Sequence, residues 1–225
     1  MNWTVEYIKK ETPTTITLHF TTEKEISFQA GQWYLFDAII DEKKIKRAYS
    51  ISSAPSKNEA DVTVTLVENG IFSTYLHSLQ PGDTINAEGP YGRFIIDEDA
   101  TELVLIGAGS GIAPLMSIIR TIIKKNLDIK VTLLYSSKTQ ENIIFYNELT
   151  QLSKRETIHV HHTLTVEQWN GMTGRINKDK IEHLVTDFST PTFYICGPPL
   201  MVNAVQHILL EKNVEAQRIK TERYH

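Results

Sequence analysis

Three short motifs of this chain hold residue types that suit cofactor chemistry: Arg47-Ala-Tyr-Ser50, Gly107-Ala-Gly-Ser-Gly-Ile-Ala-Pro114 and Cys196-Gly-Pro-Pro199. The first offers a cation, an aromatic face and a hydroxyl along an extended segment. The second leaves room beside the backbone for phosphates, because glycine has no side chain. The third places a lone thiol beside a rigid turn. In this order, the motifs indicate a flavin site followed by a pyridine-nucleotide site.

The first motif gains its meaning from strand geometry. In an extended segment Arg47 and Tyr49 point to one face and Ser50 to the other, so the cation and the ring can share a cleft. The arginine fork suits a pyrophosphate, and the tyrosine ring offers a flat apolar surface for an isoalloxazine. The alternative is an edge strand with a solvated Arg47 and with Tyr49 in the core.

The glycine-rich motif is expected to bind the nucleotide pyrophosphate. Gly107, Gly109 and Gly111 permit a tight turn after an apolar strand, and the helix expected from about Pro114 adds a partial positive pole. Ile112 stands where the usual dinucleotide fingerprint has its third glycine. The alternative is a glycine turn that serves packing alone.

The third motif, with Cys196, Gly197 and Pro198, ends an apolar strand. The carboxyl ends of strands in an α/β sheet form the ligand crevice, which places the thiol toward a site. The alternative is a buried, inert cysteine.

Together the three motifs and their order resemble the ferredoxin–NADP reductase superfamily, in which a flavin-binding barrel precedes a nicotinamide-dinucleotide domain. The resemblance implies that Arg47 binds the flavin diphosphate, that Tyr49 stacks on the flavin ring and that Ser50 approaches the reactive flavin nitrogen. It implies that Cys196 lies beside the nicotinamide, where hydride passes. The cofactors implied are FAD, with FMN less favoured, and NADPH or NADH.

Two further segments extend the resemblance. Gly70-Ile-Phe-Ser73-Thr74 is similar to the segment whose amides and hydroxyls meet the flavin phosphates, and a helix after Gly70 would present unpaired amides to them. Capping of that helix by Ser73 is the alternative. Glu222-Arg-Tyr224 is similar to a terminal element whose ring, here Tyr224, covers the flavin until nicotinamide displaces it. A frayed tail is the alternative.

The choice between NADPH and NADH depends on the strand at Val131–Tyr135. It ends in Ser136-Ser-Lys138 with no acidic residue, and hydroxyls with an ammonium can hold a 2′-phosphate. This pattern favours NADPH. A solvated Lys138, with Glu141 on the ribose of NADH, is the alternative.

The rhythm of apolar residues predicts a β-barrel followed by an α/β domain. Period-2 alternation around Leu18 and Val64 indicates antiparallel strands. From Leu103 onward strands alternate with helices, which predicts a parallel sheet. The acidic run after Ile96 marks the expected boundary, with an FAD-binding domain at 1–97 and an NAD(P)-binding domain at 98–225. The expected later elements are strands at Leu103–Ile106, Val131–Tyr135, Ile158–His161 and Thr192–Cys196, and helices at about Pro114–Lys125, Ile143–Leu152 and Leu200–Glu211.

Composition excludes several classes of function. The chain has 225 residues, 41% of them hydrophobic, and a net charge of −4, which argues against nucleic-acid binding. Its single cysteine cannot supply an iron–sulfur cluster or an internal disulfide. The uncharged stretch Leu103–Ile119 is short and glycine-rich for a membrane span, and the start has no signal-like pattern, so a cytoplasmic protein is expected. His159, His161 and His162 lie on or beside one predicted strand and lack further ligands, so no metal site is expected.

These observations favour a flavin-dependent NAD(P)H oxidoreductase that passes electrons to a carrier such as ferredoxin, flavodoxin or an oxygenase component. The alternatives are a reductase of free flavin and a non-catalytic or electron-transfer subunit of a larger redox complex. The sequence names neither the acceptor nor the oligomeric state.

Overall fold

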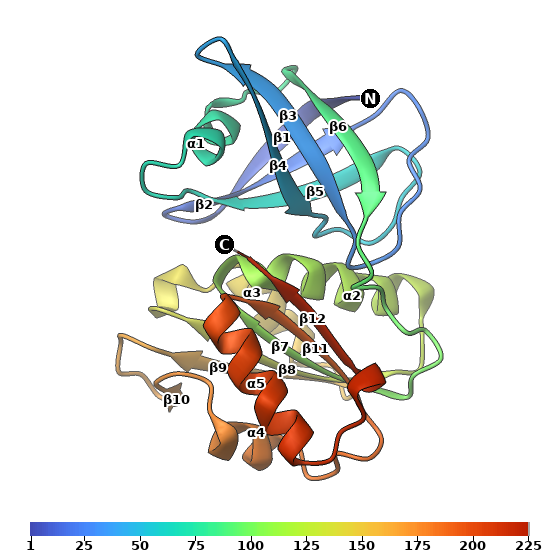
Figure 1. Ribbon diagram of the computed structural model, residues 1–225, viewed down its shortest axis with the longest axis vertical. Helices are drawn as coiled ribbons and strands as arrows, with labels where there is room; N and C mark the ends of the chain where they lie inside the picture. The colour runs from blue at the N-terminus through green and yellow to red at the C-terminus, as the bar shows by residue number, and fades with distance from the viewer. Residues whose placement is uncertain (225) are drawn as a thin grey trace.

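The computed structural model describes residues 1–224 and contains two six-stranded sheets, one in each half of the chain (Figure 1). The strands are β1 (Asn2–Thr12), β2 (Thr15–Thr21), β3 (Trp33–Ile40), β4 (Lys43–Ser50), β5 (Glu59–Thr65), β6 (Thr84–Tyr91), β7 (Glu102–Ala108), β8 (Lys130–Ser137), β9 (Ile158–Leu164), β10 (Met172–Thr173), β11 (Thr192–Gly197) and β12 (Ile219–Arg223). The α-helices are α1 (Ile71–Ser78), α2 (Ile112–Lys125), α3 (Tyr146–Leu152), α4 (Lys178–Leu184) and α5 (Pro199–Glu211). Short 3-10 turns occupy Gly109–Gly111, Gln140–Asn142 and Ala216–Arg218.

The first sheet is antiparallel, with the order β4-β3-β6-β1-β2-β5. A bridge between Ile51 and Val62 joins the chain just after β4 to β5, so the two edges of the sheet meet and form a barrel. Leu18, Phe20 and Val64 alternate with more polar neighbours and fill the barrel core. The antiparallel barrel predicted from period-2 alternation is confirmed.

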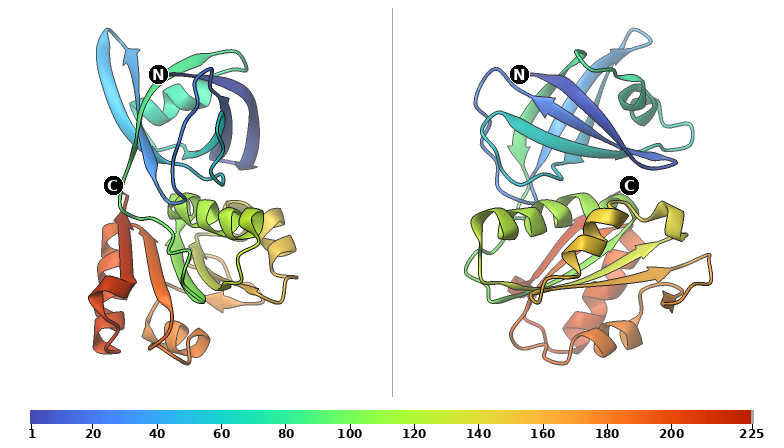
Figure 2. Two further views of the ribbon diagram at one scale, coloured as in Figure 1. Left: turned by 90° about the vertical axis from the view of Figure 1, so that its right-hand side faces the viewer. Right: turned by 180° about the vertical axis from the view of Figure 1, so that it is seen from behind.

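The second sheet is parallel, with the order β10-β9-β8-β7-β11-β12. One apolar cluster packs α2 and α3 on one face, and another packs α4 and α5 on the other. Figures 1 and 2 show α2 lying along the side of this domain that meets the barrel. The predicted parallel α/β domain is also confirmed.

Several boundaries differ from the sequence expectations. The helix expected from Ile143 begins at Tyr146, because Phe145 adopts a left-handed conformation (φ 61°) that breaks a helix. The strand expected to end at His161 continues to Leu164. The elements β10, α4 and β12 were not individually predicted.

The connection between the domains is held at several points. Phe94 packs edge-on against Tyr194 at a centroid distance of 5.2 Å, and the Tyr194 hydroxyl donates to the Ile95 carbonyl (2.7 Å). The proposed division after residue 97 falls between β6 and β7 and stays a prediction. No helix within residues 1–224 has the length and apolar character needed to cross a membrane.

Candidate active site between the two domains

The junction of the domains joins residues from distant parts of the sequence. Ser50 ends β4 of the barrel, whereas Glu222 lies in β12 and Tyr224 follows that strand. The Tyr224 hydroxyl donates to Ser50 Oγ (2.6 Å), and Ser50 Oγ donates to Glu222 Oε1 (2.8 Å). The Tyr224 amide donates to the Gly197 carbonyl (3.1 Å), which holds Tyr224 beside the carboxyl end of β11. A hydrogen-bonded chain therefore connects the barrel to the nucleotide domain.

Cys196 belongs to the same group. It pairs with Glu222 in the register of β11 and β12, is free, and has no exposed surface. Burial raises the pKa of the Cys196 thiol well above its ordinary value, and the nearby Glu222 carboxylate raises it further. The thiol is therefore protonated at neutral pH and is no nucleophile. Because Tyr224 lies against it, contact between Cys196 and a nicotinamide would require the tyrosine ring to move.

Glu222 was not among the site residues predicted from the sequence. Burial raises the pKa of its carboxyl group, while the hydrogen bond from Ser50 partly opposes that rise. A buried carboxyl group therefore holds a proton more readily than an exposed one does. The acidic residue of the terminal acidic-x-aromatic motif was the available signal.

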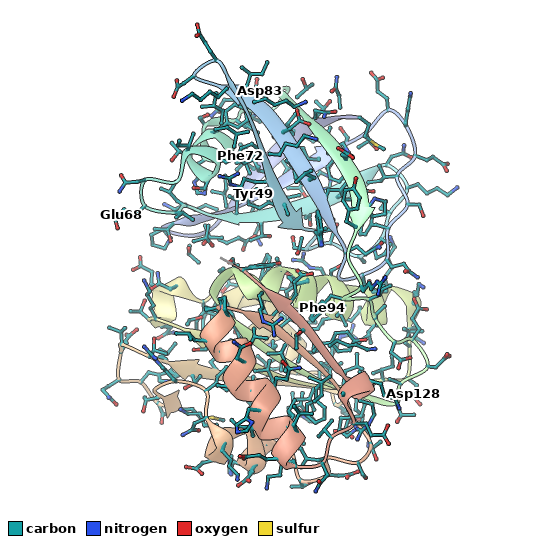
Figure 3. All side chains as sticks on the ribbon, viewed as in Figure 1. Tyr49, Glu68, Phe72, Asp83, Phe94 and Asp128 are labelled. Atoms are coloured by element: carbon teal, nitrogen blue, oxygen red, sulfur yellow. The ribbon has the colours of Figure 1, made fainter. Side chains whose placement is uncertain are left out.

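Tyr49 and Arg47 lie in β4, at one end of the barrel's strand order, a position that fits both the flavin hypothesis and the alternative of an ordinary edge strand. The Tyr49 ring is partly buried and stacks against Phe72 of α1, with centroids 6.1 Å apart (Figure 3). Burial raises the pKa of Tyr49 to about 12, so its phenol is neutral. Arg47 is exposed, and its guanidinium donates only to the neighbouring Lys46 carbonyl (2.8 Å) among the described residues. It is therefore available to an anion.

Gly70 precedes α1, as the predicted helix start requires. The Ser73 hydroxyl accepts from the Val67 amide (3.1 Å) and donates to the Gly70 carbonyl (3.0 Å). The Thr74 hydroxyl also donates to Gly70 (2.8 Å). Both hydroxyls support the turn, and no side chain among the described residues caps the helix. The amides of the first turn are thus the groups left for an anion.

The glycines of the second motif serve different purposes. At Gly109 the backbone is left-handed (φ 55°), and an added Cβ would meet nothing within 4 Å. At Gly111 an added Cβ would lie 2.3 Å from the Cys196 carbonyl oxygen, and at Gly107 it would lie 2.7 Å from Leu115 Cδ1. Gly107 and Gly111 therefore allow close packing, whereas Gly109 leaves open space. Pro114 is buried in the first turn of α2.

A cavity of about 740 Å³ lies between the barrel and the nucleotide domain. That volume is typical of ligand sites. Its walls include the predicted residues Gly109, Ser136, Lys138, Gly197, Pro198 and Tyr224. They also include Arg175, which follows β10 and had no sequence signal, and threonines from the barrel. The open glycine backbone, the two cations and the Tyr224 ring fit a nicotinamide dinucleotide.

The histidines do not gather into a ligand set. His162 packs among Tyr135, Tyr146 and Trp169, and burial lowers its pKa to about 4. His161 lies on the opposite side of β9. Within residues 1–224, no three His, Cys, Asp or Glu side chains are placed to bind a metal together.

Comparison with known proteins connects this geometry to a family. The model of the oxidoreductase FAD-binding domain matches residues 3–96, and that of the oxidoreductase NAD-binding domain matches residues 105–207. Ferredoxin–NADP reductase B of Sorangium cellulosum is 31% identical over 214 residues, which cover 89% of this chain and 87% of that protein. The chain belongs to the ferredoxin–NADP reductase superfamily. It is an oxidoreductase that binds FAD and a nicotinamide dinucleotide.

Other members of the superfamily differ in length. The glycine betaine monooxygenase reductase subunit of Pseudomonas aeruginosa is 30% identical over 206 residues, which cover 88% of this chain but 56% of the subunit. This reductase chain thus spans about half the length of that relative. A ferredoxin NADP+ reductase from Neisseria gonorrhoeae, solved with bound FAD and NADP, has a TM-score of 0.85 and 25% identity, covering 99% of this chain and 98% of its own.

Proposed function

We propose that this reductase accepts hydride from NADPH at the junction of its two domains and delivers electrons to a protein carrier. The hydrogen-bonded chain from Tyr224 through Ser50 to Glu222 carries the proposal, since it joins flavin-side and nucleotide-side residues next to Cys196. When bound, the nicotinamide and the flavin supply the hydride chemistry. The protein contributes position, shelter from water and a proton path.

Each residue of the group has a distinct proposed role. Ser50 donates a hydrogen bond at the end of β4, and Glu222 holds or releases the proton that balances flavin reduction. The neutral thiol of Cys196 shapes the floor of the nicotinamide pocket. Tyr224 covers Ser50 and must move away before the nicotinamide ring enters.

The walls of the cavity favour NADPH over NADH. Lys138 and Arg175 contribute two cations and Ser136 a hydroxyl, whereas no acidic residue is among the described residues that line it. A carboxylate there would repel a 2′-phosphate, while these groups can form charge-assisted hydrogen bonds with one. Arg175 thus adds a second cation to the 2′-phosphate site that Ser136 and Lys138 suggest.

Replacing Lys138 by alanine should therefore weaken NADPH selectively. We expect the Michaelis constant for NADPH to rise about tenfold, the loss of one charge-assisted hydrogen bond, with little change for NADH. Lys130→Ala is the matched control, because Lys130 is exposed at the opposite end of the same strand. Equal effects of Lys138→Ala on both nucleotides, or a native preference for NADH, would overturn the assignment.

The acceptor is proposed to be ferredoxin, flavodoxin or an oxygenase component, in keeping with the ferredoxin and monooxygenase named for its relatives. Anaerobic titration of the reduced protein with purified carriers tests this assignment. A carrier that reoxidises the flavin when it is added in an amount stoichiometric with the reduced protein is identified as a partner. Retention of FAD after dialysis separates a bound cofactor from flavin used as a diffusing substrate.

The lone, free Cys196 is consistent with a reducing compartment, and we propose the cytoplasm.

A further inference from the structure

A row of three donors on α2 holds the segment that follows Ser50. Ser117 Oγ donates to the Ser53 carbonyl (2.6 Å), Arg120 Nη1 to the Ser52 carbonyl (2.7 Å) and Lys124 Nζ to the Pro55 carbonyl (2.7 Å). The spacing i, i+3, i+7 places the three side chains on one face of the helix. All three bonds cross from the nucleotide domain to the barrel.

The same segment is fixed on its barrel side. The Ser52 amide donates to the Asp61 carbonyl (2.9 Å), and the Ser52 and Thr63 hydroxyls lie 2.8 Å apart. The Ile51 amide donates to the Gln32 carbonyl (3.0 Å). The backbone after Ser50 therefore cannot shift against either domain without breaking hydrogen bonds.

Arg120 is itself held in place by Glu148 and Phe145 of the nucleotide domain. Its Nε and Nη2 donate to the two carboxylate oxygens of Glu148 (2.8 and 2.6 Å), and its guanidinium lies 4.7 Å from the centroid of the Phe145 ring. Asp61 of the barrel adds a charge 3.7 Å away, and the Arg120 side chain is only 19% exposed. The planar fork is thus preorganised to bond both domains at once.

The helix that carries this row also begins at the nucleotide-binding turn. Gly109–Gly111 leads directly into α2, and α2 lies on the side of its domain that meets the barrel (Figures 1 and 2). We propose that Ser117 and Arg120 are positioning residues that set the separation of the flavin-side strand end at Ser50 from the glycine turn. This inference rests on the proposed hydride transfer between the two domains. Small errors in such a separation slow a reaction strongly while leaving binding nearly intact.

The test compares Arg120→Lys and Ser117→Ala with a matched control. Lysine keeps the charge but lacks the planar fork that bonds Glu148 and the Ser52 carbonyl together. Ser117→Ala removes one hydroxyl and introduces a better helix former. The control is Arg218→Lys, because Arg218 also donates to two carbonyls, Pro191 (2.6 Å) and Phe188 (3.0 Å), but within the nucleotide domain. The measurement is anaerobic stopped-flow reduction of FAD-loaded protein by NADPH and by 4-deuterated NADPH.

We expect each of the two positioning variants to lower the limiting rate of flavin reduction, Arg120→Lys by on the order of tenfold. The dissociation constant of NADPH should stay within about twofold, and the deuterium isotope effect should be fully expressed. Arg218→Lys should lower thermal stability without changing the rate. Wild-type rates in both positioning variants, or an equal slowing by Arg218→Lys, would overturn the inference. A wild-type protein that NADPH does not reduce would instead overturn the proposed function.

Discussion

Replacing Gly111 by alanine is expected to disrupt the nucleotide domain. The new Cβ would lie 2.3 Å from the carbonyl oxygen and 2.6 Å from the carbonyl carbon of Cys196, and backbone atoms cannot rotate away as a side chain can. Either α2 or the end of β11 must shift. We expect the free energy of unfolding to fall by about 3 kcal/mol, the upper part of the range for overpacked cores. Thermal or urea unfolding measures the loss.

Gly109→Ala is the matched control in the same turn. Its Cβ meets no atom within 4 Å, so the stability cost is confined to the left-handed backbone, about 1–2 kcal/mol. The same Cβ enters the cavity that we assign to the nucleotide and should weaken NADPH binding. The two variants thus separate packing from binding. Nucleotide affinity unchanged in Gly109→Ala would contradict the assignment of this turn to the pyrophosphate.

Replacing Tyr224 by serine should strengthen nucleotide binding rather than weaken it. The ring lies over Ser50 and Cys196, so the conformation open to nicotinamide is a minor one, and its population limits the apparent affinity. If that population is about 1–10%, removing the ring raises NADP+ affinity about tenfold to a hundredfold. The flavin absorption spectrum should also change, while FAD is retained. A point substitution is cleaner than truncation after Thr221, which would also delete part of β12.

Tyr224→Phe is the control for this experiment. It keeps the covering ring and removes only the hydroxyl that donates to Ser50. Its NADP+ affinity should therefore remain near that of the wild type. An unchanged spectrum and unchanged nucleotide affinity in Tyr224→Ser would mean that the tail takes no part in the site.

Periodicity was sufficient to predict both sheets. Alternation along β2 and β5 fixes which residues enter the barrel core. The apolar runs at Leu103 and Val131 belong to strands buried on both faces. The start of α3 could not be predicted, because a left-handed phenylalanine is imposed by packing and not by its own preference. The start of α4 did have a sequence signal, because asparagine is a preferred N-cap residue. In the structure the Asn177 side chain caps the helix by accepting from the Lys180 amide.

The candidate site was only partly readable from the sequence. Ser50, Cys196 and Tyr224 were selected from local motifs, and the fold brings them together although they are far apart along the chain. The sequence marked Glu222 only as the acidic residue of the terminal motif. Its raised pKa comes from burial, which depends on the folded structure and has no local sequence signal. Arg120 and Arg175 had no local signature. The contacts of Arg120 depend on how the two domains pack against each other. The position of Arg175 depends on the path of the loop that follows the two-residue strand β10.

Anaerobic absorption spectroscopy tests most directly whether this chain reduces bound FAD with a nicotinamide nucleotide. Purified, FAD-loaded protein should be yellow and should lose its visible flavin absorption on addition of NADPH, with NADH slower or less effective. A fully FAD-loaded sample that retains its colour with both nucleotides would contradict the account.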